Sequence, residues 1–242
     1  MQGLSPERKT VLPAGVAVLK AAFDRLKIER MVVSDGALRE GLLYDLQGRI
    51  QHDDERERTV QALARRYQAD EAHAARVSRM ASELFEQVAA DWQLSSDDHL
   101  YKLQWAAQLH EVGLAISHYQ YHKHAAYLVA HSDMPGFSRE EQYALAAMMR
   151  GQRRSIPKKQ LEQLSEDLQL PTLRLMILLR LALVFNRGRS EQTDTYVKLA
   201  VTRKGLQLTL PEGWLNEHPL TEADLKQEKH YLKAINVRLK IS

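Results

Sequence analysis

The chain has no cysteine, and this absence excludes several kinds of bond and site. Disulfides cannot form, and cysteine nucleophiles, cysteine-based zinc sites and iron–sulfur clusters are all ruled out. The sequence also has no uninterrupted apolar run near the roughly 20 residues that a membrane span needs. Its opening stretch, Met1–Leu4, lacks the basic and then apolar order of a signal peptide. We therefore expect a cytoplasmic protein with no transmembrane segment, and attachment to a membrane surface stays open.

A strong charge of one sign is absent as well, because 34 basic residues stand against 31 acidic ones and the formal charge is +3. So small a net charge gives little reason to expect nucleic acid as a partner. The basic residues do cluster between Met149 and Leu161, where no acidic residue interrupts them. This cluster consists of Arg150, Arg153, Arg154, Lys158 and Lys159. It predicts a local positive potential, and an ordinary solvated loop is the alternative.

Residues 1–52 have an α/β pattern within a chain of otherwise globular composition, with 44% hydrophobic and 27% charged residues. The pattern predicts a helix from Pro13 to about Lys27, a short strand over 30–33, a turn over 34–37 and a helix over 38–46. A lone strand between helices needs neighbouring strands to bury its faces. Residues 1–52 are therefore expected to be the end of a larger α/β domain.

Residues 53–190 have the apolar periodicity of a helical domain. Helices are predicted near 55–67, 70–91, 97–115, 121–132, 138–150, 158–166 and 171–186, with a capping box at Ser138–Glu141 and breaks at Pro135 and Pro171. Residues 191–242 predict a small α+β domain, with a hairpin over 196–210, a helix over 221–235 and a strand over 237–241. The predicted fold class is mainly α, with the helical domain between the end of an α/β domain and a small α+β tail.

A group of histidines in the helical part suggests a metal-hydrolase ancestry. His73, the pair His110-Glu111 and His124 resemble the pattern of HD-domain phosphohydrolases, whose histidines, His-Asp pair and distant Asp hold metals that activate water. Here Glu111 replaces the Asp, and Leu183 stands where the distant Asp is expected. The HD-like helical domain is therefore expected to contain a degenerate site of His73, His110 and Glu111 that holds no metal. Packing is the preferred interpretation of both histidines.

His122 and His124 lie in a polar run that precedes and opens a predicted helix. Free N–H groups at the start of a helix favour an anion such as phosphate. Phosphate binding and plain solvation both stay open for this pair.

Several longer stretches resemble the exopolyphosphatase/guanosine pentaphosphate phosphatase family, and within it the exopolyphosphatases most. They are Leu4–Gly15, Ser34–Gly41, Leu109–Leu114, His124–Leu128 and Asp133–Phe137, and the resemblance covers essentially the whole chain. The resemblance implies a four-part protein in which two actin-like domains of the sugar kinase/Hsp70 type carry the catalytic residues and Mg²⁺. An HD-like helical domain and a small tail domain would follow them.

For this chain, the resemblance implies no catalytic residue and no cofactor, with Mg²⁺ expected for the full-length enzyme. Ser34, Asp35 and Gly36 match a strand–turn–helix beside the interdomain cleft, where backbone amides could contact phosphate.

The implied activity of the full-length protein is release of terminal orthophosphate from inorganic polyphosphate. This chain, inactive alone, is expected to guide polyphosphate and to support a homodimer. The expected lining is His122, His124, Arg150, Arg153, Arg154, Lys158 and Lys159. The alternatives are a guanosine pentaphosphate phosphatase of the same family, an autonomous HD-type metal phosphohydrolase and a purely structural module.

Overall fold

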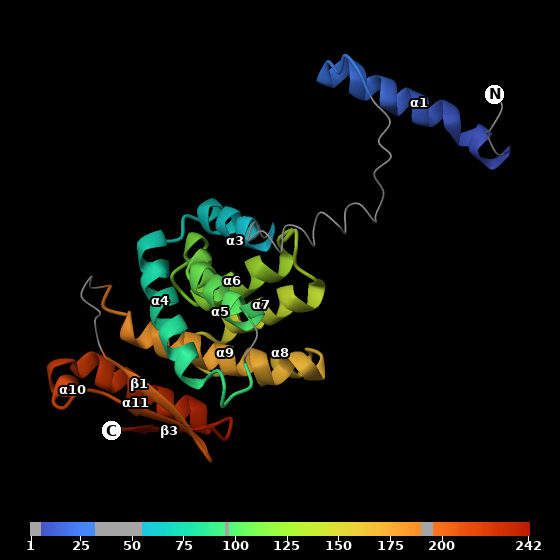
Figure 1. Cartoon of the computed structure of the whole chain (residues 1–242). Coiled ribbons are helices and arrows are strands. Elements are labelled where there is room, and N and C mark those ends of the chain that lie inside the picture. Colours follow the sequence, from blue (N-terminus) through green and yellow to red (C-terminus); the bar gives the residue numbers. More distant parts are fainter. Residues whose placement is uncertain (1–5, 32–54, 95–96, 190–195) are drawn as a thin grey trace. The chain divides into compact units, whose positions relative to one another are not determined.

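In the computed structural model, the described residues are 6–31, 55–94, 97–189 and 196–242. They are mainly helical, with one three-stranded sheet (Figure 1). This confirms the predicted fold class at that level. The chain divides into two compact units, Met1–Leu46 and Gln47–Ser242, which are described separately below.

The first unit contains helix α1, Pro6–Leu26. It starts at Pro6 instead of at Pro13, because a proline suits the first turn of a helix and the later Pro13 removes only one backbone hydrogen bond. Apolar side chains on α1, among them Val18 and Leu26, are largely exposed.

The structure tests little of the strand, turn and second helix predicted for residues 30–46. Arg30 and Met31, the described half of the strand, have no regular secondary structure. The rest of the strand, the turn with Ser34, Asp35 and Gly36, and the helix over 38–46 lie outside the described residues.

The second unit opens with a bundle of helices around one apolar core (Figure 1). Its elements are α3 (Glu55–Arg66), α4 (Glu71–Val88), α5 (Asp97–Leu109), the 3₁₀ turn η1 (Val112–Ala115), α6 (Tyr121–His131), α7 (Arg139–Gly151), α8 (Lys158–Glu162) and α9 (Glu166–Phe185). The helices predicted at 55–67, 70–91, 121–132 and 138–150 keep their place to within three residues at each end, whereas α8 ends four residues before its predicted end and α9 begins five residues before its predicted start. The capping box at the start of α7 forms as predicted, with Ser138 accepting from the Glu141 N–H and Glu141 accepting from the Ser138 N–H.

Helix α9 is the central element of this bundle, because α4, α5 and α7 all pack against it. Among the described residues, α9 is the helix long and apolar enough to cross a membrane by length and composition. Its apolar side chains, Leu175 to Ala182 in particular, are buried in the core of the unit. The same burial explains why the helix runs through Pro171, where a break was predicted. The proline forgoes only the bond to the Asp167 carbonyl near the start of the helix.

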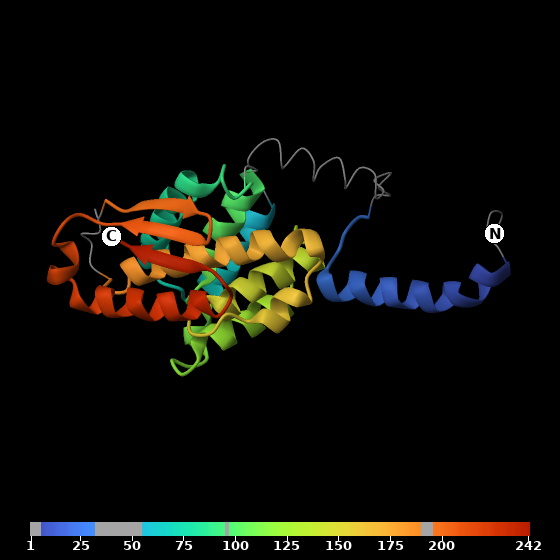
Figure 2. The same cartoon turned by 90° about the horizontal axis from the view of Figure 1, so that it is seen from below.

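The tail of the chain packs onto this bundle and forms the sheet. Strands β1 (Lys198–Thr202) and β2 (Gly205–Thr209) form the predicted hairpin, and β3 (Arg238–Ile241) pairs with β2 in parallel. The short helix α10 (Trp214–Glu217) and α11 (Pro219–Lys233) provide the crossover that parallel strands require. Figure 2 shows the three strands lying over α11 beside α9. Gly205 is needed at the turn, since a Cβ there would lie 2.2 Å from the Arg238 carbonyl oxygen.

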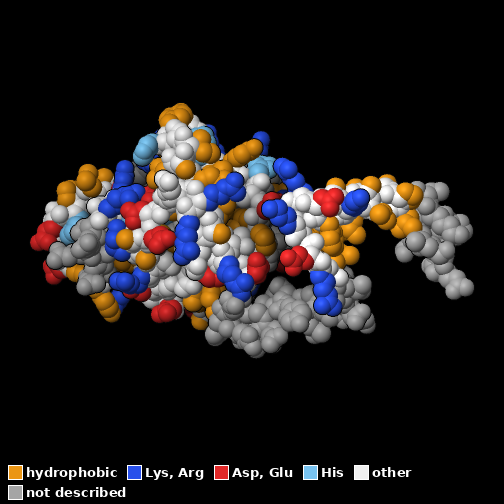
Figure 3. Space-filling model, turned by 90° about the horizontal axis from the view of Figure 1, so that it is seen from above, with side chains coloured by type: hydrophobic (Ala, Val, Ile, Leu, Met, Phe, Trp, Pro, Cys, Tyr) orange, Lys and Arg blue, Asp and Glu red, His pale blue; other side chains and the backbone are white. Residues whose placement is uncertain are grey.

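The surface carries both signs of charge. On the face drawn in Figure 3, Lys and Arg side chains are interspersed with Asp and Glu side chains. This distribution agrees with the nearly balanced composition. An excess of positive charge occurs locally, in a pocket described below.

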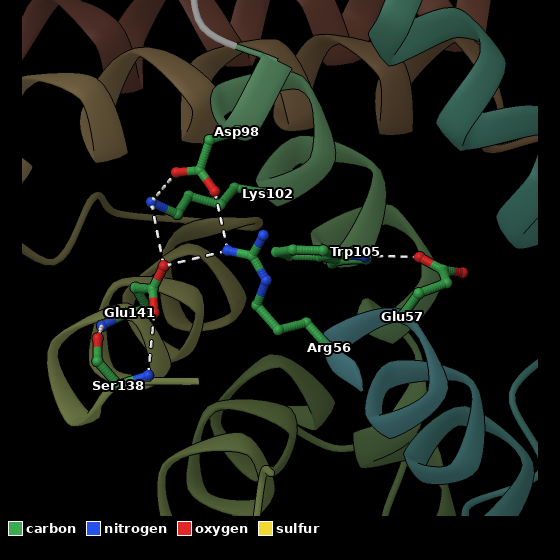
Figure 4. Close-up of polar contacts among 7 residues, drawn as sticks. All are labelled: Arg56, Glu57, Asp98, Lys102, Trp105, Ser138 and Glu141. Atoms are coloured by element: carbon green, nitrogen blue, oxygen red, sulfur yellow. Dashed lines mark hydrogen bonds and ion pairs between the residues drawn. The ribbon is translucent and has the colours of Figure 1, made fainter. Parts of the chain in front are cut away.

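One ionic cluster joins α3, α5 and α7 (Figure 4). The buried Arg56 donates to Asp98 over 2.9 Å and to Glu141 over 3.4 Å, and its guanidinium lies 4.8 Å from the ring centroid of Trp105. Lys102 bonds the same two carboxylates. Trp105 in turn donates its indole N–H to Glu57 over 2.6 Å. Because every buried charge here is paired, the cluster fixes the three helices without leaving an unsatisfied ion.

A second buried pair joins the bundle to the tail. Arg180 on α9 donates from Nε and Nη2 to the two carboxylate oxygens of Glu228 on α11, each over 2.8 Å. The same guanidinium donates to the carbonyls of Gly151, the last residue of α7, and of Arg154, which follows it. One side chain therefore holds α9, α11 and the 151–154 segment together.

Replacing Glu228 by alanine should strongly destabilise the second unit. It leaves the buried Arg180 charge without its carboxylate, at a cost of about 3–5 kcal/mol in the free energy of unfolding. Urea unfolding of the chain measures this loss. The control is Glu222→Ala, which removes an exposed partner of Lys226 on the same helix and should cost less than about 1 kcal/mol. Equal losses in the two variants would contradict the assigned role of Arg180.

Candidate functional site

The candidate site is a pocket of about 470 Å³ in the second unit. Its wall comes from the start of α4, the turn after α5, the start of α6, the segment after α7, the end of α9 and the face of α11. The predicted degenerate site and two of the predicted basic residues, Arg153 and Arg154, line this one pocket. In the sequence, the histidine site and the basic cluster had no visible connection.

The histidines and the glutamate lie close together, as the HD-like pattern predicts. The ring centroids of His73 and His110 are 5.2 Å apart, and His110 Nε2 is 3.9 Å from Glu111 Oε1. One ligand-type atom from each of the three residues lies within 4.8 Å of the others. Leu183 lines the same pocket, so an apolar side chain stands near the cluster where a second carboxylate was sought.

His110 and Glu111 lie just outside a helix, in a turn, which corrects the prediction of a helix over 97–115. Helix α5 ends at Leu109, and η1 follows the turn. Gly113 explains the change of direction, because a Cβ there would lie 2.0 Å from the Tyr121 carbonyl oxygen and 2.5 Å from the Ala125 nitrogen. Only glycine allows this close approach of η1 to α6. The approach brings Tyr121 to the wall of the pocket beside Glu111.

The histidine rings are held in one protonation state. His110 Nδ1 lies 2.6 Å from the Ala107 carbonyl oxygen, so Nδ1 carries the proton and Nε2 keeps a lone pair. Burial lowers the pKa of His110 to about 4, and burial followed by the charge of His110 lowers the pKa of His73 to about 4. Both rings are therefore neutral at pH 7. Nδ1 of His73 and Nε2 of His110 are buried without a hydrogen-bond partner.

Arg189 supplies a positive charge beside the cluster, at the carboxylate of Glu111. Arg189, just after α9, donates to the Glu111 carboxylate, and its second terminal nitrogen lies 2.9 Å from Asp70 Oδ2. Asp70 also caps α4 by accepting the His73 N–H. The single carboxylate of the cluster is thus already neutralised by a guanidinium. Two neutral imidazoles and one paired carboxylate do not suit Mg²⁺, which prefers several free oxygen ligands.

Arginines outnumber carboxylates around the pocket. The wall contains Arg153, Arg154, Arg180, Arg187 and Arg189 against Glu111, Asp224 and Glu228. Arg180, Arg187 and Arg189 each pair with one of the carboxylates. Arg153 and Arg154 have no carboxylate partner in the part of the chain that the structure describes, and Arg153 lies 5.8 Å from the ring centroid of Tyr121. The pocket is therefore net positive.

The other predicted anion-binding residues lie elsewhere. Arg150 lines a separate hollow between α6 and α7, and Lys158 and Lys159 are exposed at the start of α8. His122 is buried with Nδ1 unpartnered, and His124 is half-buried. Burial, then the charges of Arg150, Arg154 and Arg153, lowers the pKa of His122 to about 4. The seven residues proposed as one lining therefore do not share one pocket.

Several residues of this wall were not predicted from the sequence. Tyr121, Gln152, Arg180, Arg187, Arg189 and Asp224 all line the pocket. A local signal did exist for two of them, because Arg187-Gly188-Arg189 directly follows the helix that was searched for a metal ligand. Nothing local marks Arg180, a lone charge in an apolar helix, as a partner of Glu228.

The buried histidines should make the second unit acid-sensitive. In the unfolded chain a histidine takes up a proton near pH 6.5, whereas His73, His110 and His122 do so only near pH 4 when folded. The unfolded state then binds more protons as the pH falls from 6.5, and about 1–2 kcal/mol per histidine should be lost by pH 5. Urea unfolding at pH 7 and pH 5 measures the loss. His110→Gln should reduce it, whereas replacing the exposed His230 by glutamine should leave it unchanged.

Comparisons with known proteins agree on one family. Residues 56–229 match the family described as Ppx/GppA phosphatase, domain III, and residues 1–50 match the Ppx/GppA phosphatase family. A protein of Aeromonas hydrophila subsp. hydrophila is 40% identical over 228 residues, which are 94% of this chain and 46% of that protein. Proteins of Aeromonas salmonicida and Photobacterium profundum are 39% and 37% identical, over 94% of this chain in each case.

All three relatives are named guanosine-5'-triphosphate,3'-diphosphate pyrophosphatase. The chain spans about half the length of these curated relatives, 45–46% in each case. The two family matches together cover most of the sequence, and they cover both of its compact units. The chain belongs to the Ppx/GppA phosphatase family.

Proposed function

We propose that the full-length protein hydrolyses a phosphoanhydride bond of a guanosine nucleotide that carries a 5'-triphosphate and a 3'-diphosphate. The observation that carries this proposal is the name shared by relatives that are 37–40% identical over 94% of this chain. Their name favours the guanosine pentaphosphate alternative over the exopolyphosphatase activity expected from the sequence motifs. The proposal includes Mg²⁺ as the cofactor of the full-length enzyme.

The contribution of this chain to that reaction is non-catalytic. Among the described residues, His73, His110 and Glu111 form a group that could hold a metal ion. The carboxylate of Glu111 is already paired with Arg189. The neutral imidazoles of His73 and His110 are weak general bases, because burial lowers the pKa of each to about 4, and strong activation of a water would need a more basic group or a metal. Catalysis is therefore assigned to residues outside the described part of the chain. The chain also contributes contacts of a homodimer, which light scattering of the purified protein tests.

A comparison of substrates tests the activity. The full-length protein should release phosphate from the guanosine pentaphosphate nucleotide with a kcat/KM at least about tenfold above that for long inorganic polyphosphate, a difference of about 1.4 kcal/mol in transition-state binding. This chain alone should release none from either. A preference for polyphosphate would overturn the assignment and restore the exopolyphosphatase hypothesis. Phosphate release by this chain alone would refute the non-catalytic role.

Exopolyphosphatase activity remains the second candidate because of one specific feature, the exposed basic segment after α7. Lys158 and Lys159 project from α8 outside the pocket, where a long polyanion could lie along the surface with each phosphate held weakly. His124 and Arg150, which are half-buried, are further contacts in this hypothesis, whereas the predicted contact His122 is buried and is left out of it.

Reversing two of these charges tests the second candidate. In the full-length protein, Lys158→Glu with Lys159→Glu should raise the KM for long polyphosphate by about tenfold and flatten its salt dependence. The control reverses Arg203 and Lys204, which are exposed at the turn between β1 and β2. An unchanged KM and salt slope would remove the segment from the polyphosphate path.

A further inference from the structure

The inner wall of the pocket offers unused hydrogen-bond acceptors. His73, His110 and Gln152 are 4%, 2% and 3% exposed, and each has one buried polar atom without a partner. Gln152 already donates its side-chain amide to the His110 carbonyl over 2.8 Å, so its free atom is the acceptor Oε1. The free atom of His110 is the lone pair on Nε2. Buried acceptors of this kind are costly unless a donor meets them.

The rim of the same pocket carries two arginines, and Arg153 already contacts the ring and the hydroxyl of Tyr121. Arg153 and Arg154 are exposed, and both lack a carboxylate partner within the described ranges. The backbone beneath them is fixed, because Arg180 donates from Nη2 to the Arg154 carbonyl over 2.8 Å. Guanidinium groups on a fixed backbone are well suited to bind phosphate oxygens in pairs.

Three kinds of ligand can be compared against this arrangement. A divalent cation is disfavoured, since arginines outnumber carboxylates and Arg189 already neutralises Glu111. Inorganic polyphosphate matches the rim, but apart from a partly protonated terminal P–OH it has no donor for the inner acceptors. A phosphate ester with hydroxyl groups matches both, because its phosphates are anionic and its hydroxyls donate. A pocket of about 470 Å³ is within the range of nucleotide-sized ligands.

We infer that this pocket binds a ribonucleoside polyphosphate, with the phosphates on Arg153 and Arg154 and sugar hydroxyls donating to Gln152 Oε1 and His110 Nε2. Tyr121 forms the side wall between rim and interior. Burial raises its pKa above the ordinary value, so its phenol stays protonated and can donate as well. The choice of a guanosine nucleotide as the probe rests on the proposed function, whereas the ligand class rests on the pocket.

Calorimetric titration of this chain with three probes of similar charge tests the inference. The probes are guanosine 5'-triphosphate, its 2',3'-dideoxy analogue and inorganic tripolyphosphate. Guanosine 5'-triphosphate should bind about tenfold or more tightly than either of the others, since each of those leaves the buried acceptors unmet. Equal affinity for all three, or no binding of guanosine 5'-triphosphate, would overturn the inference.

Two variants assign the binding to this pocket. Arg153→Ala with Arg154→Ala should weaken binding of guanosine 5'-triphosphate by about tenfold or more, while leaving the melting temperature near that of the parent chain. Gln152→Ala should reduce the difference between the ribose and dideoxy probes. The control, Arg203→Ala with Lys204→Ala, removes two exposed cations from the hairpin turn and should change neither. Unchanged binding in the Arg153/Arg154 variant would place the ligand elsewhere.

The titration and the turnover assay fail independently. Loss of nucleotide turnover in the full-length protein would refute the proposed function and leave binding to this chain intact. Absence of binding to this chain would refute the pocket assignment and leave the proposed function standing.

Discussion

The buried pair between Arg180 and Glu228 is the interaction on which the rest of the second unit depends. Burying both charges is expensive, and the two parallel hydrogen bonds together with the carbonyls of Gly151 and Arg154 offset that cost. Burial raises the pKa of Glu228, and the guanidinium of Arg180 opposes that rise. Because the pair joins α9, α11 and the segment at the end of α7, it sets three of the six wall segments of the pocket relative to one another.

The pocket brings two histidines and a glutamate together in a setting whose electrostatic balance does not suit a metal ion. A metal would supply positive charge to the histidines and the glutamate, and Arg189 supplies it here from outside the cluster. The guanidinium satisfies Glu111 and Asp70, and burial, which lowers the pKa of His73 and His110, keeps the imidazoles neutral. The remaining charge of the wall is then positive, so the pocket favours an anion over a cation.

The predictable part of the fold was the part governed by local rules. Apolar periodicity placed the helices of residues 53–186, and the capping box at Ser138–Glu141 located the start of α7. Errors arose where contacts distant in sequence prevail over local preference. Helix α5 stops at Leu109 because Gly113 packs against the backbone of α6, and α9 continues through Pro171 because its apolar side chains fill the core.

The sequence by itself determined the helical class, the hairpin of the tail, the absence of thiol chemistry and the shortage of metal ligands near His110. Each of these follows from composition or from spacing along a single element. Only the tertiary structure decided that Arg153 and Arg154 line the same pocket as His110, that Lys158 and Lys159 do not, and that Arg189 neutralises Glu111. These facts depend on contacts between segments that are distant in the sequence, and such contacts cannot be derived from the spacing of residues along one element.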